Sequence, residues 1–299
     1  MTPTDTFQTH RPRLFALAYR LLGSRSDAED IVQDAWLRWQ GADTGGIRDP
    51  EGWLVTATTR LGLDRLRALR SARVEYVGPW LPEPLEIALD PDPLQDPAQR
   101  HALADEVSVA FLALLEQLKP DERAAFLLKD VFDYDYPDIA PLLEHSPANC
   151  RQLVHRARQR LQTGAPRFTV SPAQHRDLLA RFMAASQQGD LEAIRALLDA
   201  NAEMISDGGG RVTAAIRPLL GAERIAQLYW AIARRNGQHP AQLGQVNGEP
   251  AILRFAGDQL HSVTMITVDA GRIVRVLSVL NPEKLTALVT ARDAGASSR

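Results

Sequence analysis

A stretch rich in proline and acidic residues divides this chain and limits how it can fold. Between Val74 and Gln99 the sequence contains six prolines, six acidic residues and no lysine or arginine. A segment of this composition cannot bury enough apolar surface to form a core. The 299-residue length suits two to three domains. We therefore predict separately folded parts joined by a linker over residues 74–104.

The head of this linker is unlike a passive spacer. It reads YVGPWLPEP over residues 76–84 and contains Tyr76, Trp80 and Leu81. Its prolines fix φ, so the segment is already extended and loses little entropy when it binds. We predict that these apolar side chains lie in a groove of a folded domain. The remainder, EIALDPDPLQDP, is interpreted as an acidic spacer.

Composition narrows the class of protein. The net charge of −3 argues against a protein that binds DNA tightly by itself, because phosphate binding needs an excess of basic residues. The single cysteine, Cys150, excludes intramolecular disulfides and a cysteine-cluster zinc site, and it suits a reducing cytosol. No signal peptide and no membrane-spanning apolar run are recognised. We expect a cytoplasmic protein without a metal or cofactor.

Residues 7–73 predict an all-helical domain. Apolar residues recur at helical spacing up to Gly23, which ends the first helix. Ser26 and Glu29 are interpreted as a capping box that begins the second. A third helix is expected from about Pro50 to Arg73. Its part over 59–73 holds five arginines and one acid. A helical wheel places on one face Thr56, Thr59, Arg60, Arg67 and Arg70.

Guanidinium groups beside threonine hydroxyls suit phosphates and base edges, although a merely solvated helix face has the same composition.

The sequence predicts a second helical domain, with helix-turn-helix spacing, over residues 105–163. A short helix is expected from about Pro137, a turn at Glu144–Ser146, and a long helix from Pro147. The long helix carries a buried apolar stripe that includes Cys150.

The outward face of this long helix contains no acidic residue and suits the major groove of DNA. Its residues are Arg151, Gln152, His155, Arg156 and Gln159. Taken singly, His155 also fits an ordinary surface position.

The sequence predicts a separate α+β domain over residues 171–290. Helices are expected over 175–189 and 190–201, followed by the strands AILRF, HSVTMITVD and RIVRVLSVL. The tail 291–299 is expected to be disordered.

Two motif blocks carry a resemblance to a known family. RLFALAYRLLGSRSDAEDIVQDAWLRWQ with WLVTATTRLGLDRLR resembles region 2 of sigma-70 initiation factors, and LEQLKPDERAAFLLKDVFDYDYPDIAPLLEHSPANCRQLVHRARQRL resembles region 4. Since no recognisable domain lies between them, the chain is similar to the extracytoplasmic-function (ECF) sigma factors. YVGPWLPEP, DGGGR (207–211) and NPEKL (281–285) resemble the SigJ-like subgroup, which has a C-terminal SnoaL-like domain.

The resemblance implies a multidomain fold: a region 2 helical bundle, a region 4 helix-turn-helix and a SnoaL-like cone of curved sheet and helices. The implied partners are promoter DNA and core RNA polymerase, through its β′ coiled coil and β flap. The polymerase-binding residues would be Asp30, Ile31, Gln33, Asp34, Trp36 and Leu37. Residues that read the −10 element would be Arg60, Asp64, Arg65, Arg67 and Arg70. The helix 147–162 would read the −35 element.

The C-terminal domain of the resembled subgroup modulates sigma activity in cis. The residues expected to form this interdomain contact are Tyr76, Trp80, Leu81, Asp207, Gly208, Gly209, Gly210, Arg211, Asn281, Pro282 and Lys284. Three successive glycines allow a close backbone approach, although Asp-Gly-Gly-Gly is also simply a turn. We expect the groove for the linker head near 207–211 or 281–285.

Three functions remain open from the sequence. The first is a promoter-specificity subunit of RNA polymerase, not an enzyme, that its own C-terminal domain regulates. The second is a DNA-binding regulator that uses only the helix-turn-helix. The third is a SnoaL-type enzyme fused to a DNA-binding module, with a pocket formed by Asp207, Arg211, Tyr229, Trp230 and His261. In that case Asp207 and His261 would transfer a proton. A small-molecule ligand for this pocket is compatible with each of them.

Overall fold

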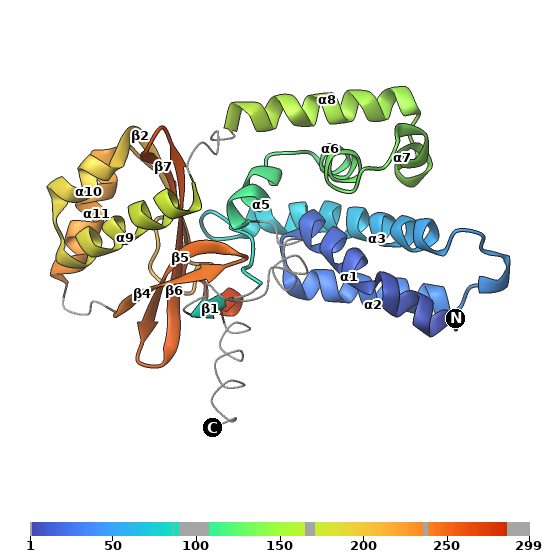
Figure 1. Cartoon of the computed structure of the whole chain (residues 1–299), viewed down its shortest axis with the longest axis horizontal. Coiled ribbons are helices and arrows are strands. Elements are labelled where there is room, and N and C mark those ends of the chain that lie inside the picture. Colours follow the sequence, from blue (N-terminus) through green and yellow to red (C-terminus); the bar gives the residue numbers. More distant parts are fainter. Residues whose placement is uncertain (1, 86, 90–107, 165–170, 236–238, 286–299) are drawn as a thin grey trace. The chain divides into compact units, whose positions relative to one another are not determined.

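The computed structural model describes residues 2–85, 87–89, 108–164, 171–235 and 239–285 (Figure 1). The chain forms two compact units: one comprises residues 1–75 and 111–165, and the other comprises 76–110 and 166–299. The linker head therefore belongs to the same unit as the C-terminal domain. Within the described residues, no helix combines the length and the apolar character needed to cross a membrane.

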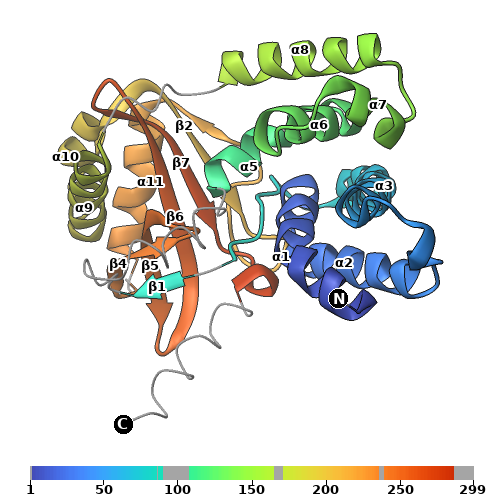
Figure 2. The same ribbon diagram turned by 45° about the vertical axis from the view of Figure 1, so that its right-hand side comes forward.

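The helices of the first unit are α1 (Pro3–Leu22), α2 (Arg25–Gln40), α3 (Pro50–Ala72), α6 (Pro120–Phe126), α7 (Tyr136–Leu143) and α8 (Pro147–Gly164), with α5 (Val109–Leu115) at the boundary between the units. Short helical turns lie at η1 (Thr44–Gly46), η2 (Arg73–Glu75) and the π-helical η3 (Leu127–Val131). Helices α1, α2 and α3 pack together as a bundle, and α6 and α7 pack on α8 (Figures 1 and 2).

Local signals explain most of these helix ends. Gly23 adopts φ 69° and ends α1, as the sequence predicts, because glycine enters the left-handed region without strain. The predicted cap of α2 is wrong. Ser24, not Ser26, is the N-cap: its extended backbone lets its hydroxyl accept from the Asp27 amide at 3.3 Å, whereas Ser26 already lies inside the helix.

The helix-turn-helix has the predicted geometry. Helix α7 ends at Glu144, whose φ of 57° turns the chain, and the Ser146 hydroxyl accepts from the Asn149 amide at the start of α8. Along α8 the predicted apolar stripe is buried, and Cys150 is completely enclosed, which confirms it as a core residue. The face on the other side of α8 stays exposed.

In its described residues the second unit contains a sheet, the helices α9 (Pro172–Gln188), α10 (Leu191–Leu197) and α11 (Ala222–Arg234), and a helical turn over 282–285. Its strands, in spatial order, are β1 (Ile87–Leu89), β4 (Ala241–Val246), β5 (Glu249–Ala256), β6 (Gln259–Asp269), β7 (Arg272–Val279), β2 (Leu198–Asp207) and β3 (Leu219–Leu220). All neighbours are antiparallel except β2 and β7, which are parallel. Helices α9, α10 and α11 pack on the sheet, with α9 against β4 to β6 and α11 against β2 and β3.

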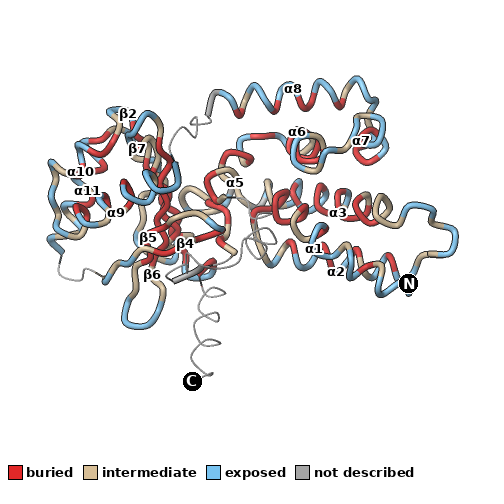
Figure 3. The backbone as a smooth tube through the Cα atoms, viewed as in Figure 1, coloured by how far each residue is buried: buried red, intermediate tan, exposed pale blue. Residues whose placement is uncertain are grey.

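The core of this unit lies between the helices and the sheet. Phe182 of α9 and Ile225 of α11 are fully buried there together with Ile252 and Ile273 from the strands. Figure 3 shows the buried backbone concentrated along the sheet and along the inner sides of the helices. Strands β4 and β5 are joined by Asn247 and Gly248, which both have positive φ, as a two-residue hairpin turn requires.

Three expectations for this unit need correction. The helix predicted over 190–201 stops at Leu197, because Leu198 turns extended and begins strand β2. Helix α11 was not expected. The interpretation of EIALDPDPLQDP as a spacer is partly wrong, because Ile87–Leu89 pairs with Val246–Gly244 of β4 and so belongs to the sheet. Residues 90–97 of that spacer and the tail 291–299 lie outside the described residues.

Candidate functional sites

The surface of α2 carries the residues predicted to bind polymerase. Asp30, Gln33 and Asp34 are exposed, and Leu37 is an apolar side chain that is 56% exposed to solvent. Trp36 lies half-buried against Phe7, with ring centroids 4.8 Å apart. Ile31 does not belong to this surface, because it is buried in the helical core. The remaining side chains form an acidic face with an exposed apolar centre, which suits a basic partner helix.

The predicted −10 face of α3 lies against the helices of the region 4 half. The Arg60 guanidinium donates to the Pro141 carbonyl at 2.9 Å and lies 3.6 Å from the Glu144 carboxylate. Arg67 donates to Asp121 at 2.8 Å. Arg70 donates to the backbone carbonyl of Leu118. Three of the predicted DNA-binding arginines are thus engaged by protein acceptors.

The other residues predicted on α3 have different surroundings. Arg65 pairs with Asp27 of α2 at 2.6 Å, and exposed Asp64 lies 3.2 Å from Arg67. The expected position of Thr59 is wrong: it is fully buried, because the helical core and not solvent surrounds that part of α3. Its hydroxyl has no hydrogen-bond partner among the described residues, so it is not part of an exposed DNA-binding face.

A buried ion cluster holds the two halves of the first unit together. Glu116 accepts from both Arg73 and Arg123. Arg123 is almost completely buried and also donates to the carbonyl of Arg20 at 3.0 Å. Burial lowers the pKa of Arg73, and the Glu116 carboxylate beside it acts against this effect. Compared with the exposed pairs of Arg60 and Arg67, this cluster is the more shielded part of the contact.

The predicted −35 face lies on α8 and is exposed. Arg151, Gln152, His155 and Arg156 line one shallow depression, and Gln159 is exposed one turn further on. Its cations have weak partners within the unit. The Arg151 guanidinium lies 5.5 Å from the Tyr136 ring centroid, and Arg156 lies 3.6 Å from the buried Glu122. These side chains form a continuous donor surface that a DNA groove can accept.

The linker head is bound to the C-terminal domain around one carboxylate. Asp207 ends strand β2 and is fully buried. Its Oδ1 accepts from the Tyr76 hydroxyl at 2.6 Å and from the Gly209 amide at 3.1 Å. Its Oδ2 accepts from the Leu81 amide at 2.8 Å and from Lys284 Nζ at 2.6 Å. One side chain therefore joins both ends of the apolar linker head to the domain.

Lys284 completes this site from the NPEKL segment. Its ammonium also donates to the Leu81 carbonyl and lies 4.1 Å from the Trp80 ring centroid and 5.3 Å from that of Tyr76. A cation above an aromatic face in a partly desolvated site is attracted by the ring electrons. Leu81 is buried in this site. Burial is the main cause that raises the pKa of Tyr76, so the Tyr76 phenol stays protonated and donates its hydrogen bond.

The glycine loop and Asn281 approach the linker closely. Asn281 Nδ2 donates to the Tyr76 hydroxyl at 3.0 Å. Gly209 has φ 58°, and a Cβ there would lie 2.3 Å from Asn281 Nδ2. A Cβ on Gly210 would lie 3.0 Å from that of Val77. Gly208 is close to the loop itself, since its Cβ would meet the Val212 carbonyl at 2.7 Å.

The remaining residues of the two motifs are more peripheral. Arg211 pairs with Glu283 at 2.7 Å, but both side chains are 62% exposed, and Pro282 is exposed. A second anchor was not expected from the sequence. The Leu85 amide donates to Asn247 Oδ1 at 2.8 Å, so the β4–β5 hairpin turn also binds the linker. The Asn-Gly dipeptide at 247–248 is the sequence signal that could have pointed to this turn.

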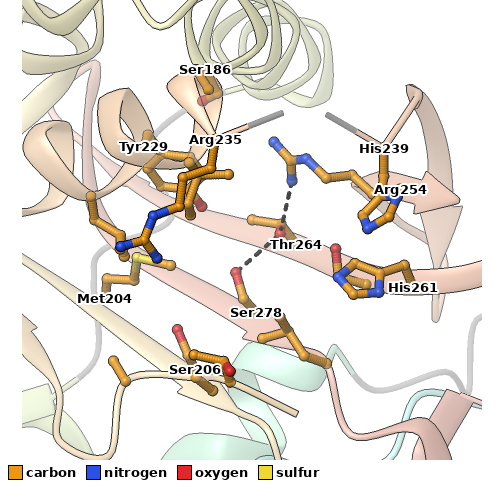
Figure 4. A pocket seen from close by; sticks show the side chains of 18 of the residues that line it. Ser186, Met204, Ser206, Tyr229, Arg235, His239, Arg254, His261, Thr264 and Ser278 are labelled. Carbon is orange, nitrogen blue, oxygen red and sulfur yellow. Dashed lines mark hydrogen bonds between the residues drawn. The ribbon is translucent and has the colours of Figure 1, made fainter. Parts of the chain in front are cut away.

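A cavity of about 420 Å³ lies between the sheet and the helices of the C-terminal domain (Figure 4). Tyr229 and His261 line it, as predicted, but Asp207, Arg211 and Trp230 do not. The expected proton-transfer pair is wrong, because Asp207 projects to the linker and its carboxylate is occupied there. The cavity residues that sequence reasoning missed include Arg254, Thr264 and Ser278.

Hydroxyl groups and cations gather on one side of this cavity. Thr264 and Ser278 hydroxyls are 3.0 Å apart, and Arg254 Nη1 lies 3.5 Å from Thr264 Oγ1. Burial raises the pKa of Tyr229, which lies beside these hydroxyls. The pKa of His261 is lowered, first by burial and then by His239 and Arg254. No cluster of three or more potential metal ligands occurs in the part of the chain that the structure describes.

Comparisons with known proteins agree with this architecture. The family model described as Sigma-70 region 2 matches residues 6–72, and that described as Sigma-70, region 4 matches residues 108–161. The chain is 36% identical over 292 residues to the ECF RNA polymerase sigma factor SigJ of Mycobacterium tuberculosis, covering 94% of this chain and 92% of the relative.

Two further matches cover nearly the whole chain. The probable ECF RNA polymerase sigma factor SigI of Mycobacterium tuberculosis is 33% identical over 287 residues, with 94% of each chain covered. A crystal structure of the Mycobacterium tuberculosis extracytoplasmic function sigma factor SigJ superposes with a TM-score of 0.75 at 34% identity. That match covers 95% of this chain and 99% of the other. The likeness therefore includes the C-terminal domain as well as the two helical domains.

Proposed function

Because the chain belongs to the ECF RNA polymerase sigma factors, we propose that it binds the β′ coiled coil of core polymerase through α2 and the β flap through its region 4 half. In this proposal α3 reads the −10 promoter element and α8 reads the −35 element. The exposed acidic face of α2 and the acid-free face of α8 support these roles. The C-terminal domain modulates this activity in cis through the linker head.

The binding of the linker head by Asp207 is the observation that carries the regulatory part. The linker connects the two domains that must contact DNA elements about two helical turns, or roughly 70 Å, apart. Fully extended, residues 75–104 could span about 100 Å at ~3.3 Å per residue. Docking of its head on a third domain shortens the part that is free to extend. The strength of this docking therefore limits how far the two DNA-binding domains can separate.

The contacts of α3 indicate a second level of control. Arg60, Arg67 and Arg70 are occupied by acceptors of the region 4 half, so they must be released before α3 reads DNA. Each exposed ion pair contributes little to the free energy that holds the two halves together, typically below about 1 kcal/mol. A nanomolar complex with polymerase provides roughly 12 kcal/mol. Binding of that strength exceeds the contribution of the exposed pairs, and the buried Glu116 cluster is the part of the contact that polymerase must also overcome.

In vitro transcription with full-length variants tests the proposal. Arg156→Ala should reduce transcripts from a cognate promoter at least tenfold and leave binding to core polymerase unchanged. Asp34→Ala with Leu37→Ala should weaken core binding. Trp80→Ala should change transcript yield without changing core affinity. The sigma-factor roles are contradicted if the wild-type protein neither binds core polymerase nor supports initiation from any candidate promoter. The cis-regulatory role is contradicted if Trp80→Ala leaves transcription unchanged.

A further inference from the structure

The cavity of the C-terminal domain has the size of a small-molecule site. Its volume of about 420 Å³ lies within the range of about 300–1,000 Å³ that is usual for ligand pockets. Apolar atoms form most of its wall, and the lining side chains include Met204, Leu219, Leu228 and Ile232. A ligand that fits must therefore present an apolar body of modest size.

The ionisable side chains of the wall, apart from the Tyr229 phenol, are basic. Figure 4 shows Arg235 and Arg254 at the cavity, with His239 and His261 side by side. The two imidazole centroids are 4.2 Å apart. No aspartate or glutamate is among the described residues that line the cavity. The walls thus combine two permanent cations and two imidazoles without a lining carboxylate to compensate them.

Arg254 is the central group of this arrangement. It is half-buried, its guanidinium lies 3.5 Å from the Thr264 hydroxyl, and the centroid of the Tyr229 ring lies 5.9 Å away. A partly desolvated guanidinium is most stable when it binds an anion with paired hydrogen bonds. The Thr264 and Ser278 hydroxyls beside it can donate to the same anion.

The cavity and the linker-binding site share the ends of two paired strands. Ser206 of β2 lies opposite Ser278 of β7, and both line the cavity. The next residue of β2 is Asp207, which holds the linker. Leu280 also lines the cavity, and its amide donates to the Asp207 carbonyl at 2.8 Å. A ligand that shifts these strand ends would therefore act on the linker site one residue away.

We propose that this cavity binds a small amphipathic carboxylate, and that its binding changes how firmly the linker head is held at Asp207. The carboxylate is placed against Arg254 and the Thr264 hydroxyl, and the apolar body lies against Leu228 and Ile232. The binding step stands on the cavity alone. The coupling to the linker rests on the proposed cis-regulatory function.

Calorimetric titration of the full-length protein tests the binding step with two matched pairs of probes. Hexanoate is compared with hexan-1-ol, and 4-phenylbutanoate with 4-phenylbutan-1-ol, because each pair differs mainly in charge. At least one acid should bind at least tenfold more tightly than its alcohol. Arg254→Gln should remove this preference, and His261→Asn should weaken it. Arg234→Gln is the control, because this neighbouring arginine does not line the cavity and stacks on Trp230.

Two outcomes overturn the binding step: neither acid binds below about 10 mM, or acid and alcohol bind equally well in the wild-type protein. Coupling is tested by hydrogen exchange of the linker peptide 76–85 with and without the acid that binds. A change of at least threefold supports coupling, and unchanged exchange at saturation overturns it. Failure of the cis-regulatory function is distinguishable, because the acid would still alter exchange while Trp80→Ala left transcription unaltered.

Discussion

Replacing Asp207 by asparagine should release the linker head from the C-terminal domain. The substitution keeps the shape of the side chain but removes its charge and turns one acceptor into a donor. In the folded protein this carboxylate accepts from Tyr76, Leu81, Lys284 and Gly209. An amide cannot accept from all of them, so at least one donor faces an NH₂ group and the Lys284 ammonium loses its countercharge.

The size of the effect follows from burial. Asp207 has no exposed surface, and the Lys284 side chain is 11% exposed, so solvent cannot replace the lost interaction. Breaking one partner of a buried ion pair typically costs about 3–5 kcal/mol. Since about 1.4 kcal/mol corresponds to a factor of ten, the population of the undocked linker should rise by about 10²- to 10⁴-fold.

Hydrogen exchange measures this opening directly. The Leu81 amide donates to Asp207 Oδ2, so its exchange reports the local opening of the docked linker. In Asp207→Asn it should exchange at least a hundredfold faster. The Leu85 amide, which donates to Asn247, shows whether the rest of the linker follows.

Glu283→Gln is the matched control. It breaks the Arg211–Glu283 pair in the same region, but that pair is largely exposed and should contribute less than about 1 kcal/mol. If Leu81 exchange is the same in Asp207→Asn and in the wild type, the linker is not held by this carboxylate. If Glu283→Gln has the larger effect, the argument from burial is refuted.

Three further changes test other parts of the structure. Gly209→Ala should weaken linker docking and speed hydrogen exchange of the Leu81 amide at least tenfold. The φ of 58° at this position is strained for alanine, and the added Cβ would meet Asn281. Gly257→Ala is the control, because Gly257 also has a positive φ but a Cβ there would meet no atom within 4 Å. Burial raises the pKa of Glu249 from 4.5 to about 7, so the folded protein retains a proton that the unfolded chain loses in this interval. Stability should fall by about 3 kcal/mol as pH rises through this interval, and thermal melts of Glu249→Gln should lack that loss. Asp121→Asn should release Arg67 from α6 and raise promoter-DNA affinity by no more than about fivefold in anisotropy titrations, since both side chains are partly exposed. A larger rise would contradict the conclusion that this ion pair is weak.

Features encoded by neighbouring residues could be predicted from the sequence. Gly23 ends a helix because its own backbone permits φ 69°, and the turn at Glu144 follows from short-range spacing between two helices. The apolar residues around Cys150 form one stripe because a single helix repeats every 3.6 residues. None of these features depends on a distant part of the chain.

Features that depend on distant partners could not be predicted in the same way. The strand Ile87–Leu89 exists because β4 lies beside it, far away in the sequence. Strand β6 is buried on both faces along most of its length, so its sequence does not alternate regularly between apolar and polar residues. For this reason the sequence alone does not indicate that Thr264 faces the cavity. Asp207 could be located in a motif, but only the fold shows that it holds the linker and leaves the cavity without an acid.

The two sets of contacts differ in strength, and this difference suggests an order of events. Besides the Glu116 cluster and the part-buried hydrogen bond from Arg70 to Leu118, α3 is held to the region 4 half by exposed pairs that polymerase and promoter DNA can replace one by one. The linker head is held by a fully buried carboxylate, Asp207, and two of its donors, Leu81 and Lys284, are buried as well. Polymerase binding should therefore separate the α3 contacts first and leave the linker head docked. A signal that acts on the strand ends at Ser206 and Ser278 would then control the remaining step, because it reaches a contact of the linker head that polymerase does not replace.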